Sequence, residues 1–65
     1  MWHKTKKVPL IELISMAVKS KSPADTYVTW YTNNCLLYMC SLVTIEYMND
    51  EDYNDNTVFT IWEKE

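Results

Sequence analysis

The sequence predicts an α+β domain in which one N-terminal helix packs on a three-stranded antiparallel β-meander. Residues 9–20 carry apolar side chains at helical spacing, and residues 26–64 are rich in β-branched and aromatic residues separated by polar turns. The chain has 65 residues, which is enough for a single small domain over 1–65. At this size one core only marginally offsets chain entropy, so association with a partner would favour folding.

The composition indicates a folded protein and disfavours most cofactor sites. The hydrophobic fraction of 48% is too high for a disordered segment. The chain contains no glycine, arginine or glutamine, which removes glycine-rich phosphate loops and bidentate guanidinium clamps. We therefore expect no cofactor.

Charge is distributed unevenly along the chain. The first 21 residues carry +4 and the remainder −7, within a total of −3. Residues 1–8, with Lys4, Lys6 and Lys7, are interpreted as a basic arm. Such segregation predicts a charge dipole that steers oppositely charged partners, with solubility as the simpler alternative.

Residues 9–20 form the clearest predicted element, a helix. Its apolar positions follow the i, i+3, i+4, i+7, i+8 spacing of one helical face and are Leu10, Leu13, Ile14, Ala17 and Val18. Pro9 suits the first helical position, and Lys19 suits the negative end of the helix dipole. Ser22 and Pro23 then end the helix.

Three strands are predicted after the helix. Residues 26–32 form the first, and Asn33-Asn34 supplies a two-residue hairpin turn that pairs Thr32 with Cys35. The second runs from 35 to about 48, with a bend or bulge near Ser41. The third covers 57–64 and follows a polar loop.

This register divides the side chains of the first two strands between two apolar faces. The face expected to receive the helix carries Val28, Trp30, Leu37, Met39, Val43, Ile45 and Tyr47. The opposite face carries Tyr27, Tyr31, Leu36, Tyr38, Cys40 and Leu42. Because aromatic patches concentrate binding energy, we interpret this second face as a surface for self-association or for a partner. In the alternative, the basic arm with Trp2 folds over it.

Neither a metal site nor a catalytic site is expected. Cys35 and Cys40 point to opposite faces of the predicted strand, and His3 lies in the arm. One histidine and little interior volume do not assemble a nucleophile, a base and a pocket, so the chain is predicted not to be an enzyme. Two unpaired cysteines favour a reducing, cytoplasmic compartment. The longest apolar run, 35–40, is far short of the roughly 20 residues of a membrane span, so no membrane partner is expected.

Acidic side chains dominate the predicted loop before the third strand. A rigid acidic ridge flanked by tyrosines would fit the basic groove of a nucleic-acid-handling protein. The candidate partner-binding residues are Glu46, Asp50, Glu51, Asp52, Tyr53, Asp55, Tyr31 and Tyr38. The alternative for the loop alone is solvated charge.

This chain is small, acidic, rich in Asn, Lys and Tyr and without an enzyme motif. In these respects it resembles the proteins that bacterial viruses encode to block host enzymes or defence systems. This resemblance of type implies a non-catalytic inhibitor, or DNA mimic, acting in the host cytoplasm. One alternative is a homodimer whose acids serve only solubility. Another is nucleic-acid binding through the lysine-rich arm, which the acids elsewhere in the chain disfavour.

Overall fold

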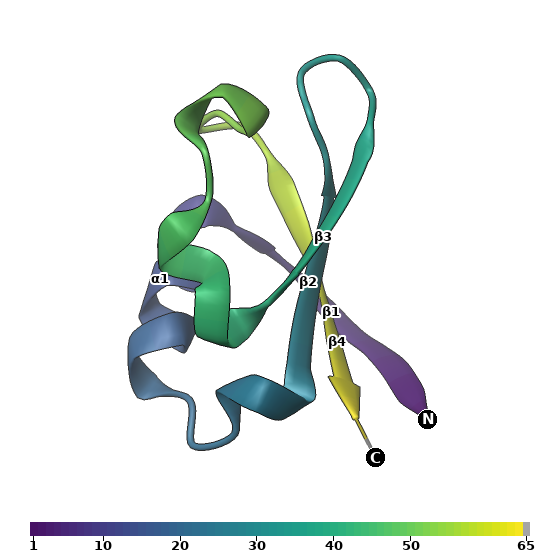
Figure 1. Ribbon diagram of the computed structural model, residues 1–65, viewed down its shortest axis with the longest axis vertical. Helices are drawn as coiled ribbons and strands as arrows, with labels where there is room; N and C mark the ends of the chain where they lie inside the picture. Colours follow the sequence, from purple (N-terminus) through teal and green to yellow (C-terminus); the bar gives the residue numbers. More distant parts are fainter. Residues whose placement is uncertain (65) are drawn as a thin grey trace.

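The fold is a four-stranded antiparallel sheet with helical segments on one face, as Figure 1 shows. It was obtained as a computed structural model, and the structure describes residues 1–64. Its elements in chain order are β1 (Trp2–Pro9), α1 (Leu10–Lys19), η1 (Pro23–Asp25), β2 (Thr26–Tyr31), β3 (Leu37–Ser41), η2 (Leu42–Tyr47), η3 (Asp50–Asp52) and β4 (Val58–Lys64), where η denotes a 3₁₀ helix. The predicted α+β class is confirmed.

Helix α1 confirms the element predicted over 9–20. Pro9 is the N-cap, with extended backbone (φ −75°, ψ 169°), so the same residue ends β1 and starts the helix. The N–H of Ser20 donates to the carbonyl of Met16 at 2.8 Å and closes the last turn. Leu13 is completely buried, whereas Val18 remains 81% exposed, so the apolar face of α1 is only partly covered.

The expected three-stranded meander is wrong in strand number and order. The segment interpreted as a basic arm is strand β1, which pairs along its whole length with β4 and contains an irregularity between Lys4 and Lys6. The sheet order is β1-β4-β2-β3, so β4 lies between β1 and β2 and does not pair with β3. Phe59 and Ile61 of β4 are fully buried, which explains why this strand occupies a central position.

The predicted hairpin register is wrong by one residue. Trp30 lies opposite Tyr38, and the N–H of Thr32 donates to the carbonyl of Leu36 at 2.8 Å. The turn therefore spans three residues, 33–35, and Cys35 takes the left-handed conformation with φ 63°. Because side chains alternate along a strand, this shift exchanges the two faces of β3.

The long second strand ends at the predicted bend, but its continuation is not a strand. Ser41 caps η2, and its Oγ accepts from the N–H of Val43 at 3.3 Å. Leu42 and Ile45 of η2 turn into the core, with 2% and 9% exposure. A ten-residue α1 leaves part of the sheet bare, and η2 covers it. The third predicted strand is confirmed as β4.

The core lies between the sheet and the helical segments. Its buried hydrophobic residues are Val8, Leu13, Val28, Trp30, Leu42, Ile45, Phe59 and Ile61. The Trp30 and Phe59 rings pack with centroids 5.4 Å apart. The indole N–H of Trp30 donates to the carbonyl of Asp52 at 3.0 Å, which ties η3 to the core.

The other face of the sheet, called the open face, has no helix over it in the described part of the chain (Figure 1). Strand alternation and pairing assign to it Trp2, Lys4, Lys7, Tyr27, Thr29, Tyr31, Leu37, Met39, Val58, Thr60, Trp62 and Lys64. The Trp2 ring packs on Tyr27 at 4.5 Å, so β1 shields one part of this face. Tyr31, Leu37 and Met39 remain 60–67% exposed. The alternative of a folded-over arm is thus realised only at Trp2.

Candidate functional site

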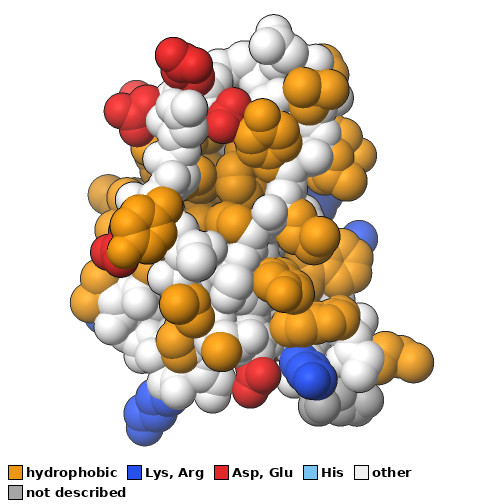
Figure 2. Space-filling model, viewed as in Figure 1, with side chains coloured by type: hydrophobic (Ala, Val, Ile, Leu, Met, Phe, Trp, Pro, Cys, Tyr) orange, Lys and Arg blue, Asp and Glu red, His pale blue; other side chains and the backbone are white. Residues whose placement is uncertain are grey.

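The acidic end of the molecule is built on η2, η3 and the following turn. It comprises Glu46, Asp50, Glu51, Asp52 and Asp55. Figure 2 shows acidic side chains gathered toward the upper left, while lysines appear toward the bottom and the right edge. Within residues 1–64, none of these five carboxylates forms an ion pair; the Lys6–Glu12 pair, at 3.8 Å, lies elsewhere.

Local hydrogen bonds hold the η3 backbone in place. The side chain of Asn49 caps η3 by accepting from the N–H of Glu51 at 3.1 Å. The N–H of Asp52 donates to the carbonyl of Asn49 at 2.9 Å. Together with the Trp30 bond to Asp52, these contacts fix a short acidic turn to the core. The backbone that carries the acidic residues of η3 is therefore held in a defined position.

Tyr53 supports the acidic end from inside. Its hydroxyl donates to Oδ1 of Asp50 at 2.9 Å, and its ring meets Phe59 edge-on at 6.3 Å. This hydrogen bond to Asp50 raises the pKa of Tyr53, and burial and the charges of Asp50 and Asp55 raise it further. Tyr53 is half-buried, so it positions Asp50 and offers little free surface of its own.

The two predicted tyrosine anchors lie on opposite sides of the sheet. Tyr31 is on the open face and 67% exposed. The expected position of Tyr38 on that face is wrong, because the hairpin register turns it to the helical side, where its ring lies 6.0 Å from Trp30. There, Tyr38 and Asp52 border one hollow of about 280 Å³. The structure thus joins Tyr38, but not Tyr31, to the acidic end.

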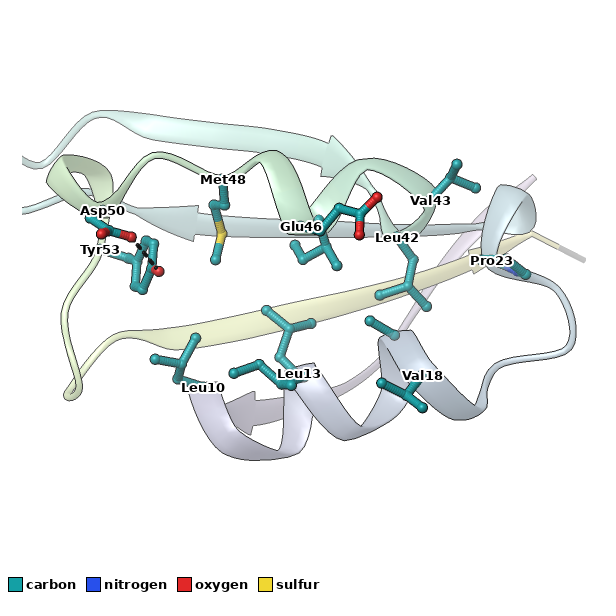
Figure 3. A pocket seen from close by; sticks show the side chains of 13 residues that line it. Leu10, Leu13, Val18, Pro23, Leu42, Val43, Glu46, Met48, Asp50 and Tyr53 are labelled. Atoms are coloured by element: carbon teal, nitrogen blue, oxygen red, sulfur yellow. Dashed lines mark hydrogen bonds between the residues drawn. The ribbon is translucent and has the colours of Figure 1, made fainter.

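An apolar groove adjoins the acidic end, and it was not predicted from the sequence. It has a volume of about 500 Å³ and lies between α1 and the segment that runs from η2 to Tyr53. Figure 3 shows Leu13 of α1 and Met48 pointing toward each other across it. The groove lining also includes Glu46 and Asp50.

Several apolar side chains of the groove remain in contact with solvent. Ile14 is 54% exposed, Val43 52% and Val18 81%. The i, i+3 spacing of Leu42, Ile45 and Met48 is the sequence signal that would have indicated a helical turn here. The β-branched run Val43-Thr44-Ile45 favoured a strand and concealed it.

The cysteines differ in exposure. Both are free; Cys35 is exposed in the turn and Cys40 is half-buried in β3. Burial raises the pKa of the Cys40 thiol, which makes its thiolate scarcer. Within residues 1–64, no three or more His, Cys, Asp or Glu side chains are grouped so that they could hold a metal ion. The expectation of a non-enzyme remains a prediction from composition.

No helix found in the 64 described residues has the length and apolarity needed to cross a membrane. Comparisons with protein-family models, curated proteins and solved structures gave no match.

Proposed function

We propose that this chain is a non-catalytic protein-binding module that inhibits a nucleic-acid-handling or defence protein by occupying its basic surface. The observation that carries the proposal is an apolar groove bordered by Glu46 and Asp50. Glu51, Asp52 and Asp55 lie on the adjoining segments, and within residues 1–64 none of the five carboxylates forms an ion pair. The type resemblance to small inhibitors of bacterial viruses supports the same class, with the host cytoplasm as the site of action.

The two parts of the surface have different physical roles. Unpaired carboxylates attract a basic partner and increase the association rate, in a manner that weakens with salt. Apolar side chains that leave water on binding supply affinity, and Ile14, Val18 and Val43 are available for this. The proposed site is therefore an apolar groove with an acidic border. The sequence predicts an acidic ridge flanked by Tyr31 and Tyr38, and of these two tyrosines Tyr38 borders a hollow shared with Asp52.

The groove and its border define the chemistry of a matching partner segment. An amphipathic helix can place its apolar stripe in the groove between α1 and η2 and a lysine or arginine near Glu46 or Asp50. Basic helices occur on nucleic-acid-binding surfaces, where they lie in the major groove. Occupying such a helix would prevent it from binding nucleic acid.

A matched pair of triple variants tests this proposal. Glu46→Gln/Asp50→Asn/Glu51→Gln removes three of the five charges of the acidic end, including both that border the groove, and Glu12→Gln/Asp25→Asn/Glu63→Gln makes the same charge change elsewhere. The probe is a fluorescent amphipathic peptide with leucines on one face and lysines beside them, followed by anisotropy at low salt. We expect the first variant to lose about tenfold in affinity, from three weak charge pairs, and the second to keep the wild-type affinity.

Two results would contradict the proposal. In one, the peptide fails to bind the wild-type protein at low salt. In the other, both triple variants lose affinity equally, which would mean that net charge alone attracts the peptide. Far-UV circular dichroism of each variant verifies that the fold is retained.

A further inference from the structure

The open face carries a charge opposite to that of the whole protein. Lys4 and Lys7 lie on it because they pair with the open-face residues Trp62 and Thr60 of β4. Lys64 lies on it because it is two residues after Trp62 in the same strand. None of the eight acidic residues within 1–64 is on this face; they belong to α1, to the loops and 3₁₀ segments, or to the helical side of β4. A chain with a net charge of −3 thus presents a cationic sheet face.

Aromatic rings lie among these lysines. Trp2 packs on Tyr27 at 4.5 Å, and Tyr27 lies opposite Trp62 in the neighbouring strand. The indole N–H of Trp62 donates to Oγ1 of Thr29 at 2.8 Å, which holds the ring along the sheet. Tyr31 lies on the same face about 13 Å further along β2, at roughly 3.3 Å per residue. The face therefore combines exposed ring surface with ammonium groups.

From this combination we infer that the open face binds single-stranded nucleic acid. Lysines bind the phosphates, and bases stack on the exposed rings of Trp2 and Tyr31 and on the uncovered part of the half-buried Trp62, since every base has an aromatic face. The predicted recognition is tolerant of sequence, because the described face offers no arginine fork to read base edges. This surface is separate from the acidic end and its groove.

Charge complementarity favours this occupant over a second copy of the chain. A face-to-face dimer would bring six lysines together without a carboxylate on either described face to neutralise them. Cations that lose water without a partner disfavour association. A polyanion, in contrast, supplies a negative charge at every nucleotide.

The acidic end does not prevent a phosphate backbone from approaching. The molecule is 31 Å long in its greatest dimension. At 0.1 M ionic strength the Debye length is about 10 Å, so carboxylates further than this from the lysines are largely screened. The repulsion expected from the net negative charge therefore weakens as salt is added.

The test uses a fluorescein-labelled mixed-sequence oligodeoxynucleotide of about 12 nucleotides, within the usual site size of such surfaces. Lys4→Gln/Lys7→Gln removes two open-face charges, and Lys19→Gln/Lys21→Gln removes two charges outside it. We expect the first variant to reduce the slope of log K against log salt by about 1.4, and the second to leave the slope unchanged.

Base stacking is tested separately. Trp2→Ala is expected to lower the affinity about tenfold and to reduce the tryptophan quenching that accompanies oligonucleotide binding. Ile11→Ala, which shortens a 79% exposed apolar side chain on α1, is the control and should keep the wild-type affinity. Circular dichroism confirms that both variants fold.

Four outcomes would overturn the inference. The first is no oligonucleotide binding by the wild-type protein at an ionic strength of about 0.1 M, where the Debye length is about 10 Å. The second is an equal loss in the two lysine variants. The third is binding to vesicles of phosphatidylserine and phosphatidylcholine without binding to the oligonucleotide, which would assign the face to a membrane surface. The fourth is a dimer that excludes the oligonucleotide.

Discussion

The two faces of the sheet are made by the same strands and are similarly apolar, yet only one is a core. Val28 of β2 and Phe59 and Ile61 of β4 are fully buried. On the other face of the same two strands, Tyr31 and Val58 are 67% and 55% exposed. The difference is the layer of α1 and η2 over the first face (Figure 1). Hydrophobic content alone therefore does not identify the core of a small sheet; the covering layer does.

The helical side carries the core, and the binding proposed for the open face does not depend on that core. The helical side holds the buried residues that offset chain entropy in a 65-residue domain. The rings and lysines of the open face lie outside this core, so we expect their removal to leave it intact. Substitutions on the two faces should accordingly act on different measurements.

The largest expected effect is at Phe59. Phe59→Ala removes a fully buried ring that packs on Trp30 and Tyr53 and should cost about 3–5 kcal/mol of unfolding free energy. Val58→Ala, one residue earlier but on the open face, should cost about 0.5 kcal/mol or less. Urea denaturation followed by circular dichroism measures both. Similar losses at the two positions would mean that both faces are buried in solution.

The next largest effect on the free energy of unfolding comes from a comparison of the indole hydrogen bonds of Trp30 and Trp62. Trp30→Phe leaves the carbonyl of Asp52 without its donor in a part-buried place and should cost about 1–3 kcal/mol. Trp62→Phe loses the bond to Thr29 on the open face and should cost about 1 kcal/mol or less. The same denaturation experiment compares them. A larger loss at Trp62 would indicate that its indole is structural.

The hairpin turn offers a smaller, opposite pair of effects. Cys35→Gly relieves the left-handed backbone of a non-glycine residue and should stabilise the domain by about 0.5 kcal/mol. Asn34→Gly adds freedom only to the unfolded chain and should destabilise by about 0.5–1 kcal/mol. Thermal unfolding distinguishes the signs. Stabilisation by Asn34→Gly would instead favour the two-residue turn and its exchanged strand faces.

The smallest effect is the pH dependence of Tyr53. Its pKa is raised in the folded state, because the hydroxyl bonded to Asp50 resists ionisation. The folded protein thus holds this proton more tightly than the unfolded chain, and stability is lost as the pH rises above the ordinary tyrosine value of 10.0. Tyr53→Phe should reduce the alkaline loss, measured as the urea midpoint at neutral and alkaline pH. Tyr47→Phe is the control, and an equal reduction in that variant would contradict the assignment.

Local sequence patterns were sufficient for part of the fold. The apolar spacing in 9–20, the β-branched run in 26–32 and the last strand all lie close to where they were predicted. The bend at Ser41 was also placed correctly. These elements are encoded within short windows, which is why they could be recognised.

Long-range pairing could not be recognised in this way. Strand β1 is lysine-rich and pairs with β4 at the other end of the chain, so its structure depends on Phe59 and Ile61 rather than on its own propensity. The hairpin register depended on whether Cys35 would accept a positive φ without the usual glycine signal. One residue of error there exchanged the faces of Tyr38 and Met39.

The candidate site was predictable to the same extent. The acidic loop is local in sequence, so its gathering around η3 was expected. The groove between α1 and η2 was not, since it exists only when 42–47 form a 3₁₀ turn above the sheet. The cationic face likewise required β1 to join the sheet, because Lys4 and Lys7 acquire a common face with Trp62 only there.

Sedimentation equilibrium of the reduced protein over a wide concentration range is the most direct test that the open face is free for binding. We expect a monomer at all concentrations, because within residues 1–64 the three lysines of the open face have no carboxylate on that face and so oppose face-to-face pairing. A stable dimer that Met39→Glu converts to monomer would contradict it, since the open face would then be an interface between copies of this chain.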